Sequence, residues 1–347
     1  MRRFALLLVV VTACASPPAP PELYEDVPVD DGKSDGVGLA PLVAVSDYAS
    51  AWEEHVTTGT LTGVAGGSLP AGAPVVAIRS LRFAGEAAWL LVDARTLDVV
   101  VATASEVAAH TREAGPGELA TTRYVAALAG SETRAYDRLA AAALAPGKVR
   151  FAVTVDMCQS ARAWEKAFFE GLVALGRRLG RPVPVGVAMT GRWAVAHPRE
   201  LGKLAAWDRD GALEITWIDH SYDHPVKDKY GNYTFLTDRS VDFTQQILRL
   251  EVLLLGQRLV PSPLFRFPGL THDAGRLAQL NQLSLFALDA NAWLAKRQPI
   301  ADGAVVLLHG NGNEPLGMDL WDDEMDDWEP ELVAGRAQIV PIADVVR

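Results

Sequence analysis

The sequence predicts an α/β protein: a closed or partly closed barrel of strands and helices over residues 148–347, preceded by a small α+β domain over residues 39–146. Three observations predict this fold class. After Lys148, apolar runs of strand length alternate with amphipathic helices, which is typical of a parallel sheet with crossover helices. Before it, short β-like runs are separated by turns rich in glycine and proline. Pro146 and Gly147 separate the two patterns, and a chain of 347 residues suits about two domains.

Residues 1–14 have the features of an export signal. Arg2 and Arg3 precede an apolar run, residues 4–11, that is too short to span a bilayer core of roughly 30 Å. Val11-Thr12-Ala13-Cys14 resembles the lipobox of bacterial lipoproteins, in which the cysteine receives the lipid. An ordinary secretory signal cut nearby is the alternative. We expect an exported lipoprotein, anchored to the membrane through Cys14 and facing the periplasm or the cell surface.

Residues 15–38 hold five prolines and six acidic residues but few large apolar groups. Such a composition buries too little surface to offset the entropy of ordering, so we expect a disordered tether. No later stretch reaches the roughly 18 consecutive apolar residues of a membrane span. The lipid is therefore the only membrane anchor that we expect.

The elements of residues 39–146 include no recognisable chemical motif, and the role of this domain stays open between glycan binding, a lid and a spacer. The predicted strands are Val75–Ser80, Ala88–Asp93 and Val99–Ala102, and the predicted helices are Asp47–His55 and Glu132–Leu144.

The elements from Lys148 onward alternate between strand and helix as far as Leu259, and four further strands follow. The first helix is marked by apolar residues every three or four positions and is closed by Gly180 and Pro182. The predicted helices are Ser160–Leu179, a short one opening at Pro198, and Ser240–Leu259. The predicted strands are Val149–Val155, Val183–Met189, Leu213–Ile218, Leu264–Phe267, Leu283–Leu288, Ala304–Leu308 and Gln338–Val340.

The composition limits the classes of molecule that the protein is expected to bind. Lys and Arg number 32 against 43 Asp and Glu, a net charge of −11, which argues against nucleic-acid binding through a basic face. An acidic monomer suits neutral or amine-bearing glycans better than anionic ones. The two cysteines exclude a disulfide framework, since Cys14 is the predicted lipid site.

Polar residues end or follow most of the predicted strands, and in βα folds the carboxyl ends of the strands form the active site. These residues are Asp156, Asp219 with His220, Asp289 and His309, and Arg266 lies within the predicted strand Leu264–Phe267. If the strand predictions hold, an acid, imidazoles and a guanidinium converge on one rim. Each also has a plainer interpretation: Asp156 as a helix cap, His309 as a core histidine, and Arg266 with Asp289 as a structural salt bridge.

His220 and His224 stand four residues apart. Within one helical turn this spacing directs both ring nitrogens to a common point, as a divalent metal requires. A solvated loop with two coincident histidines is the alternative.

Five segments of residues 148–347 form an ordered set: Thr154-Val155-Asp156, His220-Ser221-Tyr222-Asp223-His224-Pro225, Arg266-Phe267-Pro268-Gly269, Asp289-Ala290-Asn291-Ala292-Trp293 and Leu307-Leu308-His309. The set resembles the motifs of the polysaccharide deacetylase family, also called the NodB-homology or carbohydrate esterase family 4 domain. The resemblance implies a distorted or partly open (β/α) barrel of the NodB-homology type. It also implies a metal-dependent hydrolase that acts on carbon–nitrogen bonds other than peptide bonds, removing acetyl groups from an N-acetylated extracytoplasmic polysaccharide such as peptidoglycan or a chitin-like chain.

The resemblance also implies roles for individual residues. His220 and His224 would hold a divalent metal, with zinc expected. Asp156 would be the general base, oriented by Arg266, and His309 the general acid.

Asp289 of the fourth motif is a further catalytic candidate. Three other residues in or next to the motifs are candidates for contact with the substrate: Gly269, Trp293 and Tyr222. The backbone N–H near Gly269 would support the oxyanion. Trp293 and Tyr222 would stack on sugar rings or wall an acetyl pocket, with ordinary packing as the alternative.

One departure from the family pattern affects the metal. The position of the metal-binding Asp is occupied by Met157, whose thioether is a poor ligand for such an ion. We interpret Cys158 as an ordinary buried residue, and three other possibilities stay open: a Cys158 thiolate as ligand, Asp219 reaching in, or water completing the site. The departure motivates an alternative function, a catalytically lapsed glycan-binding lipoprotein with the same fold.

Overall fold

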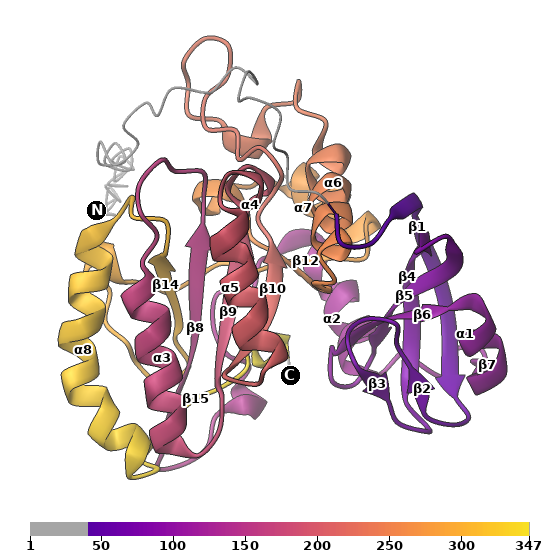
Figure 1. Ribbon diagram of the computed structural model, residues 1–347, viewed down its shortest axis with the longest axis horizontal. Helices are drawn as coiled ribbons and strands as arrows, with labels where there is room; N and C mark the ends of the chain where they lie inside the picture. The colour runs from indigo at the N-terminus through magenta and orange to yellow at the C-terminus, as the bar shows by residue number, and fades with distance from the viewer. Residues whose placement is uncertain (1–40, 347) are drawn as a thin grey trace, which may run out of the picture.

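The computed structural model of this protein describes residues 41–346, which Figure 1 shows as a larger α/β body beside a smaller β-rich domain. The predicted signal segment with Cys14 and the predicted tether, residues 15–38, lie outside the described residues. Between residues 41 and 346, no helix combines the length and apolar character that crossing a membrane requires.

The smaller domain is built on a five-stranded antiparallel sheet in the order β6-β5-β4-β1-β7. Helix α1 (Ala104–His110) connects β6 to β7, and β2 pairs only with β3. The strands are β1 (Val45–Thr57), β2 (Leu61–Thr62), β3 (Ser68–Leu69), β4 (Pro74–Phe83), β5 (Glu86–Asp93), β6 (Val99–Thr103) and β7 (Thr111–Glu113).

The helix predicted at Asp47–His55 is wrong, because these residues belong to strand β1. The register of β1 against β4 shifts twice, between Ser46 and Ala49 and between Ser50 and Glu53. Each such bulge displaces the alternation of inward and outward side chains. The apolar residues of β1 therefore recur at a spacing close to that of a helix, which misleads a prediction from periodicity.

The larger body contains an eight-stranded sheet in which all paired strands are parallel. Its path is β12-β11-β10-β9-β8-β14-β13, and β15 pairs with the start of β8. The sheet is strongly curled and its two end strands do not pair with each other in the described chain, so the predicted partly open barrel is confirmed. The strands are β8 (Val149–Met157), β9 (Val183–Met189), β10 (Leu213–Asp219), β11 (Pro261–Phe265), β12 (Phe286–Ala287), β13 (Ala292–Trp293), β14 (Val305–His309) and β15 (Ala337–Ile339).

The helices of the body lie against the outside of this sheet, with α3 and α8 side by side in Figure 1. Phe168 and Phe169 of α3 and Trp321 of α8 pack into one core cluster with β8. The helices are α2 (Arg123–Gly130), α3 (Lys166–Leu179), α4 (Gly191–Ala196), α5 (Pro198–Arg209), α6 (Phe243–Gly256), α7 (Ala274–Gln282) and α8 (Pro315–Val333). Single 3-10 turns are η1 (Ser131–Thr133), η2 (Ala141–Ala143), η3 (Phe235–Thr237), η4 (Pro268–Leu270), η5 (Leu294–Lys296) and η6 (Ile342–Val346).

The helix predicted at Glu132–Leu144 is also wrong, since only two 3-10 turns occur there. Between them the chain is extended and bridges the open side of the barrel. Tyr136 pairs with Leu288 just after β12, and Arg138 pairs with Ala304 just before β14. The backbone groups of this segment bond to the body, which outweighs the helix propensity of its alanine-rich sequence.

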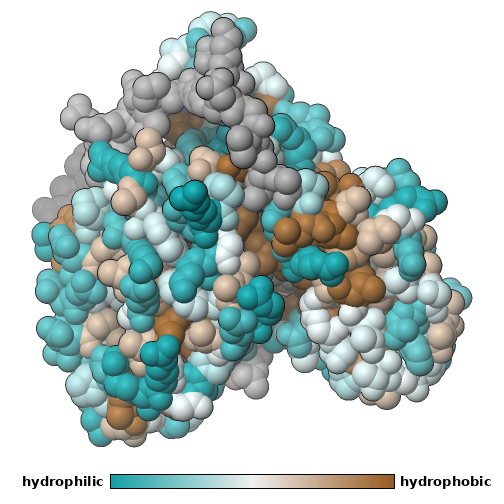
Figure 2. Space-filling view, viewed as in Figure 1, coloured by the Kyte–Doolittle hydropathy of each residue, from teal (hydrophilic) through white to brown (hydrophobic). Residues whose placement is uncertain are grey.

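The two domains share a hydrophobic core, in which Ile78 and Leu90 of the smaller domain pack in one cluster with Leu255 and Phe286 of the body. Figure 2 shows hydrophobic residues gathered along this junction. At the same place the Arg79 guanidinium is fully buried and bonds both carboxylate oxygens of Glu251 on α6, at 2.8 and 2.9 Å.

We expect Arg79→Met to destabilise the whole chain by about 3–5 kcal/mol, because Glu251 would keep a buried charge without its partner. Urea unfolding measures the change in the free energy of unfolding. The double variant Arg79→Met, Glu251→Leu should recover most of the loss. Arg82→Met, which removes the exposed pair with Asp47, is the control and should change little. If Arg79→Met alone were as stable as the wild type, the ion pair between Arg79 and Glu251 would not stabilise the contact between the domains.

Candidate metal centre and catalytic rim

The predicted polar residues gather at the carboxyl ends of the parallel strands. Asp156 lies at the end of β8 and His309 ends β14, and the two are register partners in adjacent strands. Arg266 follows β11 directly, instead of lying within a strand as predicted. Asp219 ends β10, and Asp289 lies shortly after β12.

His220 and His224 lie in an irregular loop after β10, not in the helical turn that their spacing suggested. Ser221 and His224 have positive φ angles of 68° and 45°. The Oδ1 atom of Asp219 accepts the Ser221 N–H at 2.7 Å, and Ser221 Oγ accepts the His224 N–H at 3.1 Å. These bonds hold a strained backbone that brings the two imidazole centroids to 4.9 Å.

Cys158 joins the two histidines. Its Sγ lies 3.5 Å from Nε2 of His220 and 3.5 Å from Nε2 of His224. All three side chains are buried, and their donor atoms lie within 4.8 Å of one another. A thiol donates one proton and its sulfur also accepts one, so the two equal contacts fit both a hydrogen-bonded trio and three ligands of one metal ion. The structure thus places Cys158 as a candidate metal ligand, one of the possibilities that the sequence analysis left open.

Met157 faces away from this cluster, because side chains alternate along β8. Val155 and Met157 belong to the core between the sheet and the helices, whereas Asp156 faces the rim. A Cβ atom at Gly310 would lie 2.6 Å from Met157 Sδ and 2.6 Å from Val155 Cγ1, so these side chains fill the space beside that glycine. Met157 therefore leaves no gap among the donors, since Cys158 is the residue aimed at the histidines.

The protonation states of the donors suit a metal. Nδ1–H of His220 donates to the carbonyl oxygen of Arg266 at 2.7 Å, which leaves the lone pair of Nε2 facing Cys158. Burial lowers the pKa of His220 although Asp156 opposes it. Burial alone would raise the pKa of Cys158, but the nearby histidines outweigh it and lower that pKa. A neutral imidazole and a thiolate are the forms that bind metal.

Asp156 is held between Arg266 and His220. Its Oδ1 accepts a hydrogen bond from Arg266 at 3.1 Å, and its Oδ2 lies 3.6 Å from Nε2 of His220. Burial alone would raise the pKa of Asp156, but Arg266 and His220 lower it overall, so the carboxylate is ionised. The plainer interpretation of Asp156 as a helix cap fails, because α3 begins only at Lys166.

His309 has a partner that the sequence analysis missed, Glu314 at the start of α8. Nδ1 of His309 lies 2.8 Å from Glu314 Oε2, and the Trp293 indole donates to the same oxygen at 2.9 Å. Burial lowers the pKa of His309, but Cys158 and Glu314 raise it well above its ordinary value. The carboxylate of Glu314 therefore orients His309 and favours its charged form, so His309 is not an inert core histidine. The only signal in the sequence for this pair is an acid five residues after His309.

The plainer interpretation of Arg266 and Asp289 as a structural salt bridge fails. Oδ2 of Asp289 pairs with Nε2 of His272 at 3.0 Å, whereas Arg266 reaches only the backbone oxygen of Asp289, at 3.5 Å. His272 is a second residue that the sequence analysis missed. The structure places the Asp289 carboxylate beside the rim, but outside the metal cluster of the described residues.

The other three predicted site residues, Trp293, Gly269 and Tyr222, lie at different places relative to the catalytic rim. Trp293 lies beside the rim, with its ring centroid 5.7 Å from that of His309. Gly269 has a φ of 61°, and a Cβ there would lie 2.6 Å from the ring of Phe235, whose centroid is 6.4 Å from that of His224. The Tyr222 ring packs against Gly191 and under the Arg249 guanidinium, 3.8 Å away, which favours the packing alternative for this residue.

The site thus combines three sets of groups: a Cys-His-His donor cluster, a carboxylate held by a guanidinium, and an imidazolium held by a carboxylate. Thiolate and imidazole donors fit a transition-metal ion. Asp219 is not among these donors, because its Oδ1 caps Ser221 and burial raises its pKa well above the ordinary value.

No family model matches this chain. Among solved structures it is similar to PdaA of Bacillus subtilis, a family 4 carbohydrate esterase, with 13% identity, a TM-score of 0.45 and coverage of 63% of this chain and 87% of that one. It is similar to the chitin deacetylase of Colletotrichum lindemuthianum, with 18% identity, a TM-score of 0.42 and coverage of 61% and 91%. It is also similar to a CE4 family pseudoenzyme from Bacillus anthracis, with 14% identity, a TM-score of 0.40 and coverage of 58% and 67%. Two of these three solved structures are described as members of carbohydrate esterase family 4, and the third is described as a chitin deacetylase.

Proposed function

We propose that this protein is a zinc-dependent hydrolase that removes acetyl groups from an N-acetylated extracytoplasmic glycan, either peptidoglycan or a chitin-like chain. The observation that carries the proposal is the Cys158, His220 and His224 cluster beside Asp156 and His309. The class of substrate follows from the resemblance of the five motifs to those of polysaccharide deacetylases.

The spacing of the donors supports zinc. With Zn–S near 2.3 Å and Zn–N near 2.0–2.1 Å, a sulfur and a nitrogen on one tetrahedral ion are about 3.5 Å apart. The separation of Cys158 Sγ from each imidazole nitrogen is 3.5 Å. Three protein ligands leave the fourth position open, as catalytic zinc sites do.

When bound there, zinc would act as a Lewis acid and lower the pKa of a coordinated water. The chain's own residues then handle the protons of amide hydrolysis. Asp156, ionised and with Oδ1 bonded to Arg266, accepts the proton of the attacking water on Oδ2. His309, protonated and held at Nδ1 by Glu314, donates from Nε2 to the departing sugar amine. The products are acetate and a free amine on the sugar.

The placement of this activity outside the cytoplasm belongs to the proposal. It depends on the signal-like residues 1–14 and on lipidation of Cys14, which would anchor a monomeric enzyme to the membrane. Metabolic labelling with a fatty-acid analogue, compared between the wild type and Cys14→Ala, tests the anchor directly.

The experiment that tests the function is acetate release from N-acetylated chito-oligosaccharides and from peptidoglycan. The zinc-loaded wild type should release acetate, and His220→Ala should lose both the metal and at least about 99% of the rate. Retained activity in His220→Ala would contradict the proposal. Bound zinc with no acetate from either glycan would instead favour the lapsed glycan-binding protein.

A further inference from the structure

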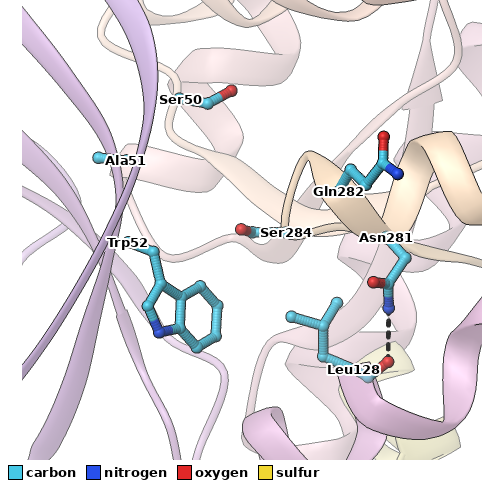
Figure 3. A pocket seen from close by; sticks show the side chains of 7 residues that line it. All are labelled: Ser50, Ala51, Trp52, Leu128, Asn281, Gln282 and Ser284. Atoms are coloured by element: carbon cyan, nitrogen blue, oxygen red, sulfur yellow. Dashed lines mark hydrogen bonds between the residues drawn. The ribbon is translucent and has the colours of Figure 1, made fainter.

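A pocket of about 510 Å³ lies at the junction of the two domains. Figure 3 shows residues 50–52 of β1 on one side and Asn281, Gln282 and Ser284 on the other, with the Trp52 indole pointing between them toward Leu128. Domain junctions are common places for ligand sites, and this pocket is a shallow hollow that is open to solvent over much of its extent.

The pocket is separate from the catalytic rim. Ser284 lies before β12 and Asp289 lies after it, so the pocket and the rim are at opposite ends of this strand. A ligand in the pocket would be held without contact to the Cys158 cluster.

The orientation of the Trp52 indole is fixed by contacts with the rest of the protein. Trp52 is 43% exposed, and it lies where the register of β1 shifts between Ser50 and Glu53. Such bulges redirect side chains and are frequent beside binding sites. The indole stacks on buried Tyr124, with centroids 6.1 Å apart and planes at 21°, and its Nε1 donates to Glu54 at 3.2 Å. One face is thus packed against the protein, and the exposed part of the ring adjoins the pocket.

The polar groups of the pocket are uncharged and partly preorganised. The Asn281 Nδ2 donates to the Leu128 carbonyl at 2.6 Å and to Ser131 Oγ at 2.9 Å, which fixes its amide. Gln282 is exposed, and its side chain makes no hydrogen bond within residues 41–346. None of the residues that line the pocket carries a charge.

We propose that this pocket binds a neutral pyranose ring of an oligosaccharide as a second, non-catalytic site. A pyranose has one face of C–H groups, which packs on an indole, and a rim of hydroxyls, which bond to amides such as those of Asn281 and Gln282. The absence of charged lining residues and the net charge of −11 disfavour an anionic ligand. That the ring belongs to an N-acetylated chain rests on the proposed function, whereas the sugar class rests on the pocket alone.

The test is calorimetric titration of the full chain with N-acetylated chitotetraose and with cellotetraose, in a His220→Ala background that prevents turnover. At least one sugar should bind, and Trp52→Ala should weaken its binding about tenfold or more. Trp52→Phe, which keeps a ring, should restore most of the affinity, and Gln282→Ala should weaken binding with the ring intact. Thermal unfolding verifies that each variant is folded.

Two results would overturn the proposal: no binding of either sugar at millimolar concentration, or equal binding by the chain with Trp52 and by Trp52→Ala. Acetate release is measured separately. Binding that depends on Trp52 in a protein without deacetylase activity would therefore refute the proposed function and leave this site standing.

Discussion

Cys158→Ser is expected to lose the metal and, with it, the hydrolase activity. The substitution keeps a small polar side chain but replaces the thiolate by a hydroxyl, which is a poor ligand for zinc at neutral pH. We expect zinc affinity to fall at least about 100-fold. Competition with a chromogenic chelator measures the affinity. Cobalt substitution supplies a second measurement, because a thiolate bound to Co²⁺ gives a charge-transfer band in the near ultraviolet that this variant should lack.

Cys158→Asp is the matched control, since a carboxylate can take the place of the thiolate. It should retain zinc within about tenfold of the wild type and lose the charge-transfer band. If Cys158→Ser bound zinc as tightly as the wild type, the cysteine would be an ordinary buried residue, and the two 3.5 Å contacts would have no metal role.

Met157→Asp is expected to destabilise the fold without improving metal binding. Met157 is fully buried on the helix-covered side of β8, where its sulfur lies in the cluster with Val155 and Phe169. A carboxylate there has no charged partner among the described residues of that core cluster, so we expect a loss of more than about 3 kcal/mol. Denaturant unfolding and zinc titration measure the two effects.

Met157→Leu keeps the volume and apolar character of the site and should cost less than about 1.5 kcal/mol. A Met157→Asp protein with wild-type stability and tighter zinc binding would mean that the native site lacks a ligand. That result would support the interpretation from the sequence, in which Met157 occupies the position of the metal-binding Asp of the family.

Much of the catalytic rim was predictable because it depends on strand ends. Asp156, His220 and His309 each stand at the polar end of an apolar run, and parallel strands bring such ends to one edge of a sheet. The partners of these residues were not predictable in the same way. Glu314 and His272 reach His309 and Asp289 from loops, whose paths no periodicity describes.

Strand β1 and residues 134–140 were less predictable than the rest of the chain, because their structure depends on pairing between distant segments. The bulges of β1 imitate a helical period, and residues 134–140 are extended only because Leu288 and Ala304 offer them partners. Local propensity favours a helix in both segments, and tertiary hydrogen bonds outweigh it.

The amino-acid sequence by itself determined the alternating α/β order, the strand-end positions of the acid and the histidines, and the acidic charge of the chain. Only the tertiary structure decided which neighbour of Asp156 faces the histidines. Alternation along β8 sends Met157 into the core, and Cys158 comes to lie 3.5 Å from both imidazoles. The physical reason is that metal ligands must point toward a common centre, and the order of residues in a sequence does not specify where side chains point. Here the pleat of β8 and the strained loop after β10 set these directions.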